Sequence, residues 1–224
     1  MIGHTLTASD GDIGKIREFY FDDQTWAIRY LVADTGTWLT GRKVLLSPYS
    51  FGRFSKSDQT LHVNLTRKQI ENSPSIDTQR PVSRQYEENY YSYYGWPVYW
   101  VGGEVWGKAD YPGRLASTTP GNVRTYDYPR WDEVHLASSK TVTGYALEAT
   151  DGPIGSVSDF LVDDKRWVIR EIAIETGHWY SGKEVLMLPS KVQRINYPEA
   201  KVFVDLSKDD IKQTAENHLA RASG

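Results

Sequence analysis

Two stretches of the chain repeat one pattern. DDQTWAIRYLVADTGTW occupies residues 22–38, and DDKRWVIREIAIETGHW occupies residues 163–179. The same offset of 141 residues aligns positions 10–70 with 151–211 without a gap. Roughly a third of the aligned positions are identical, which indicates a duplicated structural unit. The period is too long for a solenoid, so each copy is predicted to be a separate small domain of about 70 residues.

Each copy has the residue pattern of a six-stranded β domain. The Asp-Gly pairs at 10–11 and 151–152 are typical of hairpin turns. The segments WAIRYLVAD and WVIREIAIE are rich in β-branched and aromatic residues, which favour strands. Six strands with short turns use about 60 residues. We therefore predict an all-β protein with two small six-stranded antiparallel barrels, because closure removes exposed sheet edges.

A short helix is predicted after each set of strands. Thr66 and Ser207 are suitable N-cap residues, and each is followed three positions later by a side chain that can reach back to it, Gln69 or Asp210. This spacing is that of a capping box.

The connector between the copies, residues 73–134, has a different composition. Nine tyrosines and four tryptophans lie within positions 86–131. Disordered segments are poor in aromatic residues, so we expect the connector to be folded onto another part of the protein. Ser83 and Gly95 predict a short helix at 84–94, with a serine cap at its start and a glycine at its end.

The connector's aromatic residues have two interpretations. The favoured one is that they fill the groove between the two barrels, because buried aromatics dominate core energetics. The other is a recognition surface, with self-association as its simplest form. A platform for stacking sugars or bases would need convergent basic groups, and only Arg80 and Arg84 are near. The candidate interaction surface comprises Tyr90, Tyr93, Tyr94, Trp96, Tyr99 and Trp100.

Composition argues against several classes of function. The net charge is −3, so we expect no nucleic-acid partner. The absence of cysteine excludes disulfides and thiolate chemistry. No apolar run approaches the length of roughly 20 residues that a membrane helix needs, and the start of the chain lacks the pattern of a signal peptide. These features predict a cytoplasmic protein without a membrane span.

We predict no catalytic, cofactor-binding or metal-binding residues. Asp22-Asp23 and Asp163-Asp164 are the strongest candidates for acid–base work, but adjacent residues on a strand point to opposite faces, and Asp is a common turn former. No phosphate-binding or hydrolase motif is present. The histidines show no metal-ligand spacing: His4, His62, His135, His178 and His218.

Three positions that recur in both copies are expected to be structural. They are Trp26, Arg29 and Trp38 in the first copy, and Trp167, Arg170 and Trp179 in the second. We expect the stem of each arginine to pack beside an aromatic ring, while its guanidinium meets a carboxylate such as Asp34 or Glu175. An anion contact is the functional alternative.

The repeated segments resemble the PRC-barrel family. The residues that carry the resemblance are SDGDIGKIREFYFDDQTWAIRYLVADTGTWLTGRKVLLSP and TGYALEATDGPIGSVSDFLVDDKRWVIREIAIETGHWYSGKEVLMLP. The central RPVSRQYEENYYSYYGWPVYW is similar to a segment between the barrels of bacterial tandem PRC-barrel proteins. The family includes the cytoplasmic barrel of the photosynthetic reaction centre H subunit and a barrel of a ribosome maturation factor. The resemblance implies two small barrels, and it implies little about activity.

These observations predict a first barrel at 1–72, the connector at 73–134, and a second barrel with a C-terminal helix at 135–224. The predicted function is non-enzymatic binding or assembly, with a protein partner or a homo-oligomer. Two alternatives stay open. One is a ligand-dependent enzyme or small-molecule binder at the junction of the barrels. The other, implied by the resemblance, is an accessory role in ribosome maturation or in a photosynthetic complex.

Overall fold

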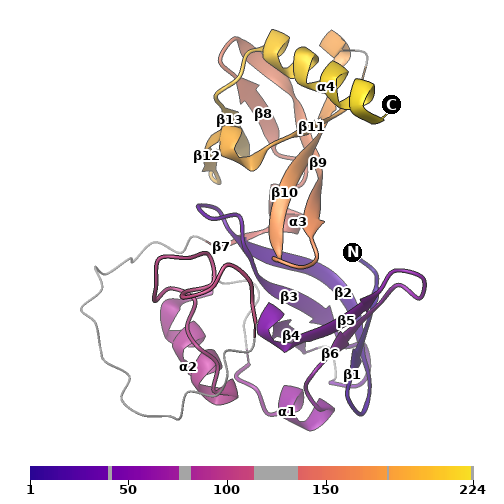
Figure 1. Ribbon diagram of the computed structural model, residues 1–224, viewed down its shortest axis with the longest axis vertical. Coiled ribbons are helices and arrows are strands. Elements are labelled where there is room, and N and C mark those ends of the chain that lie inside the picture. Colours follow the sequence, from indigo (N-terminus) through magenta and orange to yellow (C-terminus); the bar gives the residue numbers. More distant parts are fainter. Residues whose placement is uncertain (40–41, 76–81, 114–135, 181, 223–224) are drawn as a thin grey trace. The chain divides into compact units, whose positions relative to one another are not determined.

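A computed structural model describes residues 1–39, 42–75, 82–113, 136–180 and 182–222, with side chains of the last helix described up to residue 215. The chain divides into two compact units (Figure 1). The first unit consists of Met1–Leu136 together with Asp164–Trp167, and the second of Ala137–Asp163 and Val168–Gly224. The described part of the connector therefore belongs to the first unit.

The six strands that the sequence predicted form the continuous part of a seven-stranded sheet in the first unit. They are β1 (Thr5–Ala8), β2 (Gly11–Asp22), β3 (Ile28–Asp34), β4 (Lys43–Leu46), β5 (Phe51–Ser55) and β6 (Thr60–Val63), with a 3-10 turn, η1 (Pro48–Ser50), after β4. Their order is β4-β3-β2-β1-β6-β5. The seventh strand, β7 (Leu136–Ser138), also pairs with β2 and lies where the chain passes from the first unit to the second.

The second unit repeats the same order, β11-β10-β9-β8-β13-β12. Its strands are β8 (Ala146–Ala149), β9 (Gly152–Asp163), β10 (Val168–Thr176), β11 (Glu184–Met187), β12 (Val192–Asn196) and β13 (Lys201–Val204). Short helical elements accompany them: α3 (Ser139–Val142), η2 (His178–Tyr180) and η3 (Pro189–Lys191).

The prediction of closed, purely antiparallel barrels is corrected to two mixed sheets. β1 pairs in parallel with β6, and β8 with β13, whereas the other neighbours in each order are antiparallel. Within the described residues, each order has two end strands rather than a closed ring. Turn signals specify only pairings between consecutive strands, so the parallel pairing of the first strand with the last had no local signal.

Equivalent glycines allow two strands to approach each other in each unit. Gly14 has a φ of +144° and Gly155 has a φ of +149°. A Cβ at either position would lie 2.0 Å from a carbonyl oxygen of the neighbouring strand, that of Asp34 or Glu175. Only glycine fits such a contact at a positive φ.

We expect Gly14→Ala to destabilise the first unit, and Gly155→Ala the second, by about 1–3 kcal/mol each through overpacking and strain. The measurement is the free energy of unfolding in urea. Gly103→Ala is the matched control, because a Cβ there meets nothing within 4 Å and its φ is not positive; its effect should stay within about 0.5 kcal/mol. Equal changes in the free energy of unfolding for Gly14→Ala, Gly155→Ala and Gly103→Ala would contradict the close approach of the paired strands.

The predicted capping box begins α1 (Arg67–Glu71). The Gln69 amide donates to Thr66 Oγ1 at 3.2 Å, and the Thr66 amide donates to Gln69 Oε1 at 2.9 Å. Asp10, from the predicted Asp-Gly turn, accepts a hydrogen bond from the Arg67 amide at 2.7 Å. The turn that joins β1 to β2 therefore also fixes the start of this helix.

The second unit repeats this arrangement at the start of α4 (Lys208–Ala222). The Ser207 amide donates to Asp210 Oδ2 at 2.9 Å, and the Asp210 amide donates to Ser207 Oγ at 3.2 Å. Asp151 accepts from the Lys208 amide at 3.0 Å. None of the helices in the described part of the chain combines the length and the apolar character needed to cross a membrane.

The connector contains α2 (Arg84–Tyr94), which spans the range predicted from Ser83 and Gly95. Ser83 Oγ accepts from the Tyr86 amide at 3.2 Å, and Gly95 ends the helix with a φ of +66°. Local capping chemistry is sufficient to place both ends of this helix.

Candidate functional site

The candidate site is built on one side of strands β2, β3 and β4, which we call the outer face. Cross-strand pairing places Tyr20 opposite Tyr30 and Val32 opposite Leu45, and Ser47 follows β4. All five residues are buried. The residues that cover them come from the connector.

Tyr90 of α2 is the central residue of this cover and is fully buried. Its hydroxyl donates to the Leu45 carbonyl at 2.9 Å and accepts from the Ser47 amide at 3.2 Å. Its ring packs edge-on against the Tyr30 ring at a centroid distance of 5.5 Å. The helix is thus fixed to the sheet by both apolar and polar contacts.

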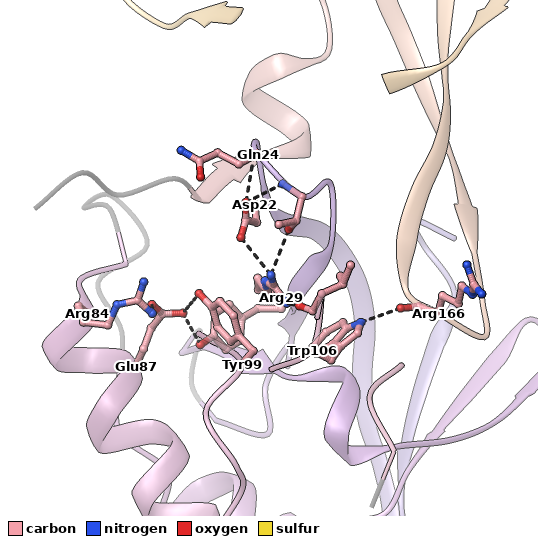
Figure 2. A network of polar contacts seen from close by, with 11 residues as sticks. Asp22, Gln24, Arg29, Arg84, Glu87, Tyr99, Trp106 and Arg166 are labelled. Carbon is pink, nitrogen blue, oxygen red and sulfur yellow. Dashed lines mark hydrogen bonds and ion pairs between the residues drawn. The ribbon is translucent and has the colours of Figure 1, made fainter. Parts of the chain in front are cut away.

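One turn earlier on α2, Glu87 is buried within a polar network (Figure 2). Its Oε1 accepts from the Tyr30 hydroxyl at 2.8 Å and from the Tyr99 hydroxyl at 2.7 Å, and its Oε2 lies 3.0 Å from Arg84 Nη1. Burial raises the pKa of the Glu87 carboxyl, although Arg84 and the two hydroxyls oppose this shift. Burial also raises the pKa of Tyr30 well above its ordinary value, so its hydroxyl stays a donor.

Arg29 forms the second half of the network and is only 2% exposed. Its Nη2 donates to Asp22 Oδ2 at 3.0 Å, and its Nη1 donates to the Val105 carbonyl at 2.7 Å. The guanidinium lies 3.8 Å from the centre of the Tyr99 ring and 4.9 Å from that of Trp106. The expectation of an arginine packed beside aromatic rings fits this residue.

Arg29 meets a carboxylate, as expected, but this carboxylate is not Asp34, the example that the sequence suggested. Asp34 pairs instead with Arg17 at 3.0 Å, and Asp22 takes its place beside Arg29. The register of β2 and β3 shifts at Arg29, so simple alternation along β3 does not relate the side-chain directions of positions 29 and 34.

Asp22 has the turn-forming role that the sequence favoured. Its Oδ1 accepts from the amides of Gln24 and Thr25, both at 3.0 Å, while its Oδ2 meets Arg29. Burial alone would raise the pKa of Asp22, but Arg29 and these amides outweigh burial and lower it.

Of the other recurring positions, the first tryptophan keeps its backbone conformation in both units, whereas the arginine and the second tryptophan have diverged. Trp26 and Trp167 both adopt the left-handed conformation, with φ of +60° and +56°. Arg170, the counterpart of Arg29, is exposed. Trp38 lies under the Arg67 guanidinium at 4.5 Å, whereas Trp179 donates to the Ile154 carbonyl at 2.5 Å.

The residues of the candidate interaction surface differ in exposure. Tyr90 and Tyr99 are buried inside the first unit, so a partner cannot reach them. Tyr93 is 42% exposed. Tyr94, Trp96 and Trp100 are half-buried.

The network anchors the connector to the sheet. Its acidic groups accept bonds from arginine, tyrosine or backbone donors that join β2, β3 and the connector. In the ranges that the structure covers, no cluster of three or more His, Asp or Glu side chains could hold a metal ion. His135 and Trp131 lie outside the described residues, as does the side chain of His218.

Sequence reasoning missed Glu87. It stands in RQYEENYY beside a second glutamate, so it resembles a solvated helix residue. Its spacing of three residues from Arg84 was the one available signal, and such pairs are common on exposed helix surfaces.

The two buried carboxyls should give opposite pH dependences. Because the pKa of Glu87 is raised in the folded state, the native protein binds that proton more readily than the unfolded chain does. The stability of the wild type relative to Glu87→Gln should therefore rise as the pH falls from 7 toward the unfolded pKa of about 4.3. Asp22 has a lowered pKa, so the wild type should lose stability relative to Asp22→Asn as the pH falls below about 4. Denaturant titrations across this pH range measure both differences in stability between the wild type and a variant. If the two differences changed with pH in the same direction, the opposite pKa shifts of Glu87 and Asp22 would be contradicted.

Comparison of the sequence with models of known protein families gives no match, and no curated protein matches the chain.

Proposed function

We propose that the chain is a non-enzymatic binding protein that binds a protein partner or a second copy of itself through an aromatic edge of its first unit. The aromatic edge consists of Tyr93, Tyr94 and Trp96, at the end of α2 and just beyond it.

The stacking of these exposed and half-exposed rings carries the proposal. The Tyr94 and Trp96 rings stack at 4.4 Å with an interplanar angle of 11°, and the Tyr93 ring packs edge-on against Tyr94 at 4.7 Å. The Tyr93 hydroxyl donates to the Gln69 carbonyl at 2.9 Å. A ring held this way loses little freedom on binding, and Tyr and Trp are the residues most often found at binding hot spots.

We further propose that the two units are of the PRC-barrel type. The support is the resemblance of the repeated segments, together with the equal strand order of the two units. The equivalent glycines and capping residues support it as well. This assignment suggests a scaffold for binding and carries no activity with it.

Light scattering of the full chain over a range of concentrations tests the self-association form. We expect the mass to rise with concentration, and Tyr93→Arg to weaken the association at least about tenfold, a loss typical of a hot-spot residue. Tyr111→Arg is the matched control, because Tyr111 is 60% exposed and lies outside the aromatic edge.

Affinity capture with wild-type and Tyr93→Arg baits tests the form with another partner. We expect the wild-type and Tyr111→Arg baits to retain a protein that the Tyr93→Arg bait loses. Two results together would overturn the proposal. The wild type would remain a monomer in light scattering, and the wild-type bait would retain no protein that the Tyr93→Arg bait loses.

A further inference from the structure

The second unit has an outer face equivalent to the one that the connector covers in the first. The offset of 141 residues relates the positions of the two faces. Glu18, Tyr20, Tyr30, Leu45 and Ser47 correspond to Asp159, Leu161, Glu171, Leu186 and Leu188.

Strand pairing places four of these residues on one side of the sheet of the second unit, and Leu188, with extended backbone two residues after Leu186, continues that alternation. Leu161 stands opposite Glu171, while Ala173 stands opposite both Asp159 and Leu186. Directly opposed residues on antiparallel strands project to the same side. The face therefore runs across β9, β10 and β11, as its counterpart runs across β2, β3 and β4.

The two faces differ sharply in exposure. Tyr30 and Ser47 are fully buried in the first unit. In the second unit Leu161 is 38% exposed and Leu188 is 53% exposed. These are two of the few large apolar side chains that are exposed in the described part of the chain, and they belong to one face.

The exposed face is acidic around its leucines. Asp159, Glu175 and Glu184 are exposed, and Glu171 is half-exposed. Glu175 stands opposite Glu184, on the same side as Glu171 because alternate residues of a strand share a side. Strands β9, β10 and β11 contain a single basic residue, Arg170.

We propose that the outer face of the second unit is a docking site for a basic amphipathic helix of a partner protein. The first unit shows that an outer face of this strand geometry accepts a helix, because α2 covers it there. In the second unit, Leu161, Leu186 and Leu188 receive the apolar stripe of the helix, and lysine or arginine side chains beside that stripe meet the surrounding carboxylates.

Charge complementarity selects this occupant over a second copy of the same face. Two such faces packed together would bring carboxylates against carboxylates, which is unfavourable. The proposal goes beyond the aromatic edge, because it concerns another unit and other residues.

Binding of a synthetic probe to the full chain tests the proposal. The probe is a fluorescent amphipathic peptide of about 18 residues, built from leucine and lysine at helical spacing, which gives a helix of about five turns. The control peptide carries glutamate in place of every lysine. By fluorescence anisotropy, we expect the lysine peptide to bind at least about tenfold more tightly than the glutamate peptide.

Two double variants locate the binding. Leu161→Ser with Leu188→Ser should weaken binding of the lysine peptide about tenfold or more, and these exposed positions tolerate such changes in the folded state. Ile2→Ser with Tyr111→Ser changes exposed apolar residues of the first unit and should leave binding unchanged.

Three results would overturn the proposal. The first is equal binding of the two peptides, and the second is equal binding by the two double variants. The third is a wild-type dimer, measured by light scattering, that Leu161→Ser with Leu188→Ser converts to a monomer. This last result would assign the face to a second copy of the chain.

Discussion

Glu87→Ala is expected to destabilise the first unit by about 3 kcal/mol, the lower end of the range for breaking a buried ion pair. The substitution leaves the hydroxyls of Tyr30 and Tyr99 without their acceptor, and each is buried. Arg84 keeps partial access to solvent, so water can solvate its charge when Glu87 is removed. The expected loss of stability is therefore at the lower end of the range. Urea unfolding followed by tryptophan fluorescence measures the change in the free energy of unfolding. The curves are fitted with a separate unfolding transition for each unit.

The neighbouring residue provides the matched control. Glu88 is an exposed glutamate on the same helix, and Glu88→Ala should change the stability by no more than about 0.5 kcal/mol. Glu87→Gln should fall between the two alanine variants, because an amide oxygen can still accept a hydrogen bond. Equal effects at 87 and 88 would contradict a buried role for Glu87.

Tyr90→Ala should cost about 3–5 kcal/mol, as expected for removing a fully buried aromatic side chain. The loss combines the cavity beneath α2 with the two hydrogen bonds to Leu45 and Ser47. Tyr90→Phe separates these contributions, and leaving the two backbone groups unpaired should cost about 1–3 kcal/mol. Thermal and chemical unfolding of the full chain measure both variants.

Tyr93 is the control for Tyr90, three residues further along the same helix and 42% exposed. Tyr93→Ala should destabilise the first unit by clearly less than Tyr90→Ala, by about 1 kcal/mol, because it loses one exposed hydrogen bond and little buried area. A cost at position 93 equal to that at position 90 would mean that the connector does not pack on β3 and β4 in this register.

Features determined by neighbouring residues were predictable from the sequence. The capping boxes at Thr66 and Ser207 and the helix between Ser83 and Gly95 depend on side chains within three or four residues of the backbone groups that they satisfy. The six strands of each unit follow from turn residues and from β-branched segments in the same way.

Features determined by distant residues were not predictable. The parallel pairing of β1 with β6 joins residues about 55 positions apart, and no turn chemistry specifies it. The contact of Glu87 with Tyr30 likewise depends on how α2 lies on the sheet. The sequence suggested Asp34 as a carboxylate partner of Arg29, whereas the observed contact with Asp22 depends on the register shift at Arg29 and on the turn after β2.

The difference between the two outer faces was partly visible in the repeat. The replacement of Tyr30 by Glu171 and of Ser47 by Leu188 could be read from the alignment. Which side of the sheet these positions occupy, and that one copy is covered by a helix, required the three-dimensional arrangement. Alternation gives the two sides of a strand but does not say what covers either of them.

Hydrogen exchange of the full chain, followed by mass spectrometry, tests most directly whether the connector is an integral layer of the first unit. The account predicts that the amides of α2 exchange as slowly as those of β3, and that Glu87→Ala accelerates both together while β10 is unchanged. Rapid exchange throughout α2 in the wild type, with β3 still protected, would contradict it.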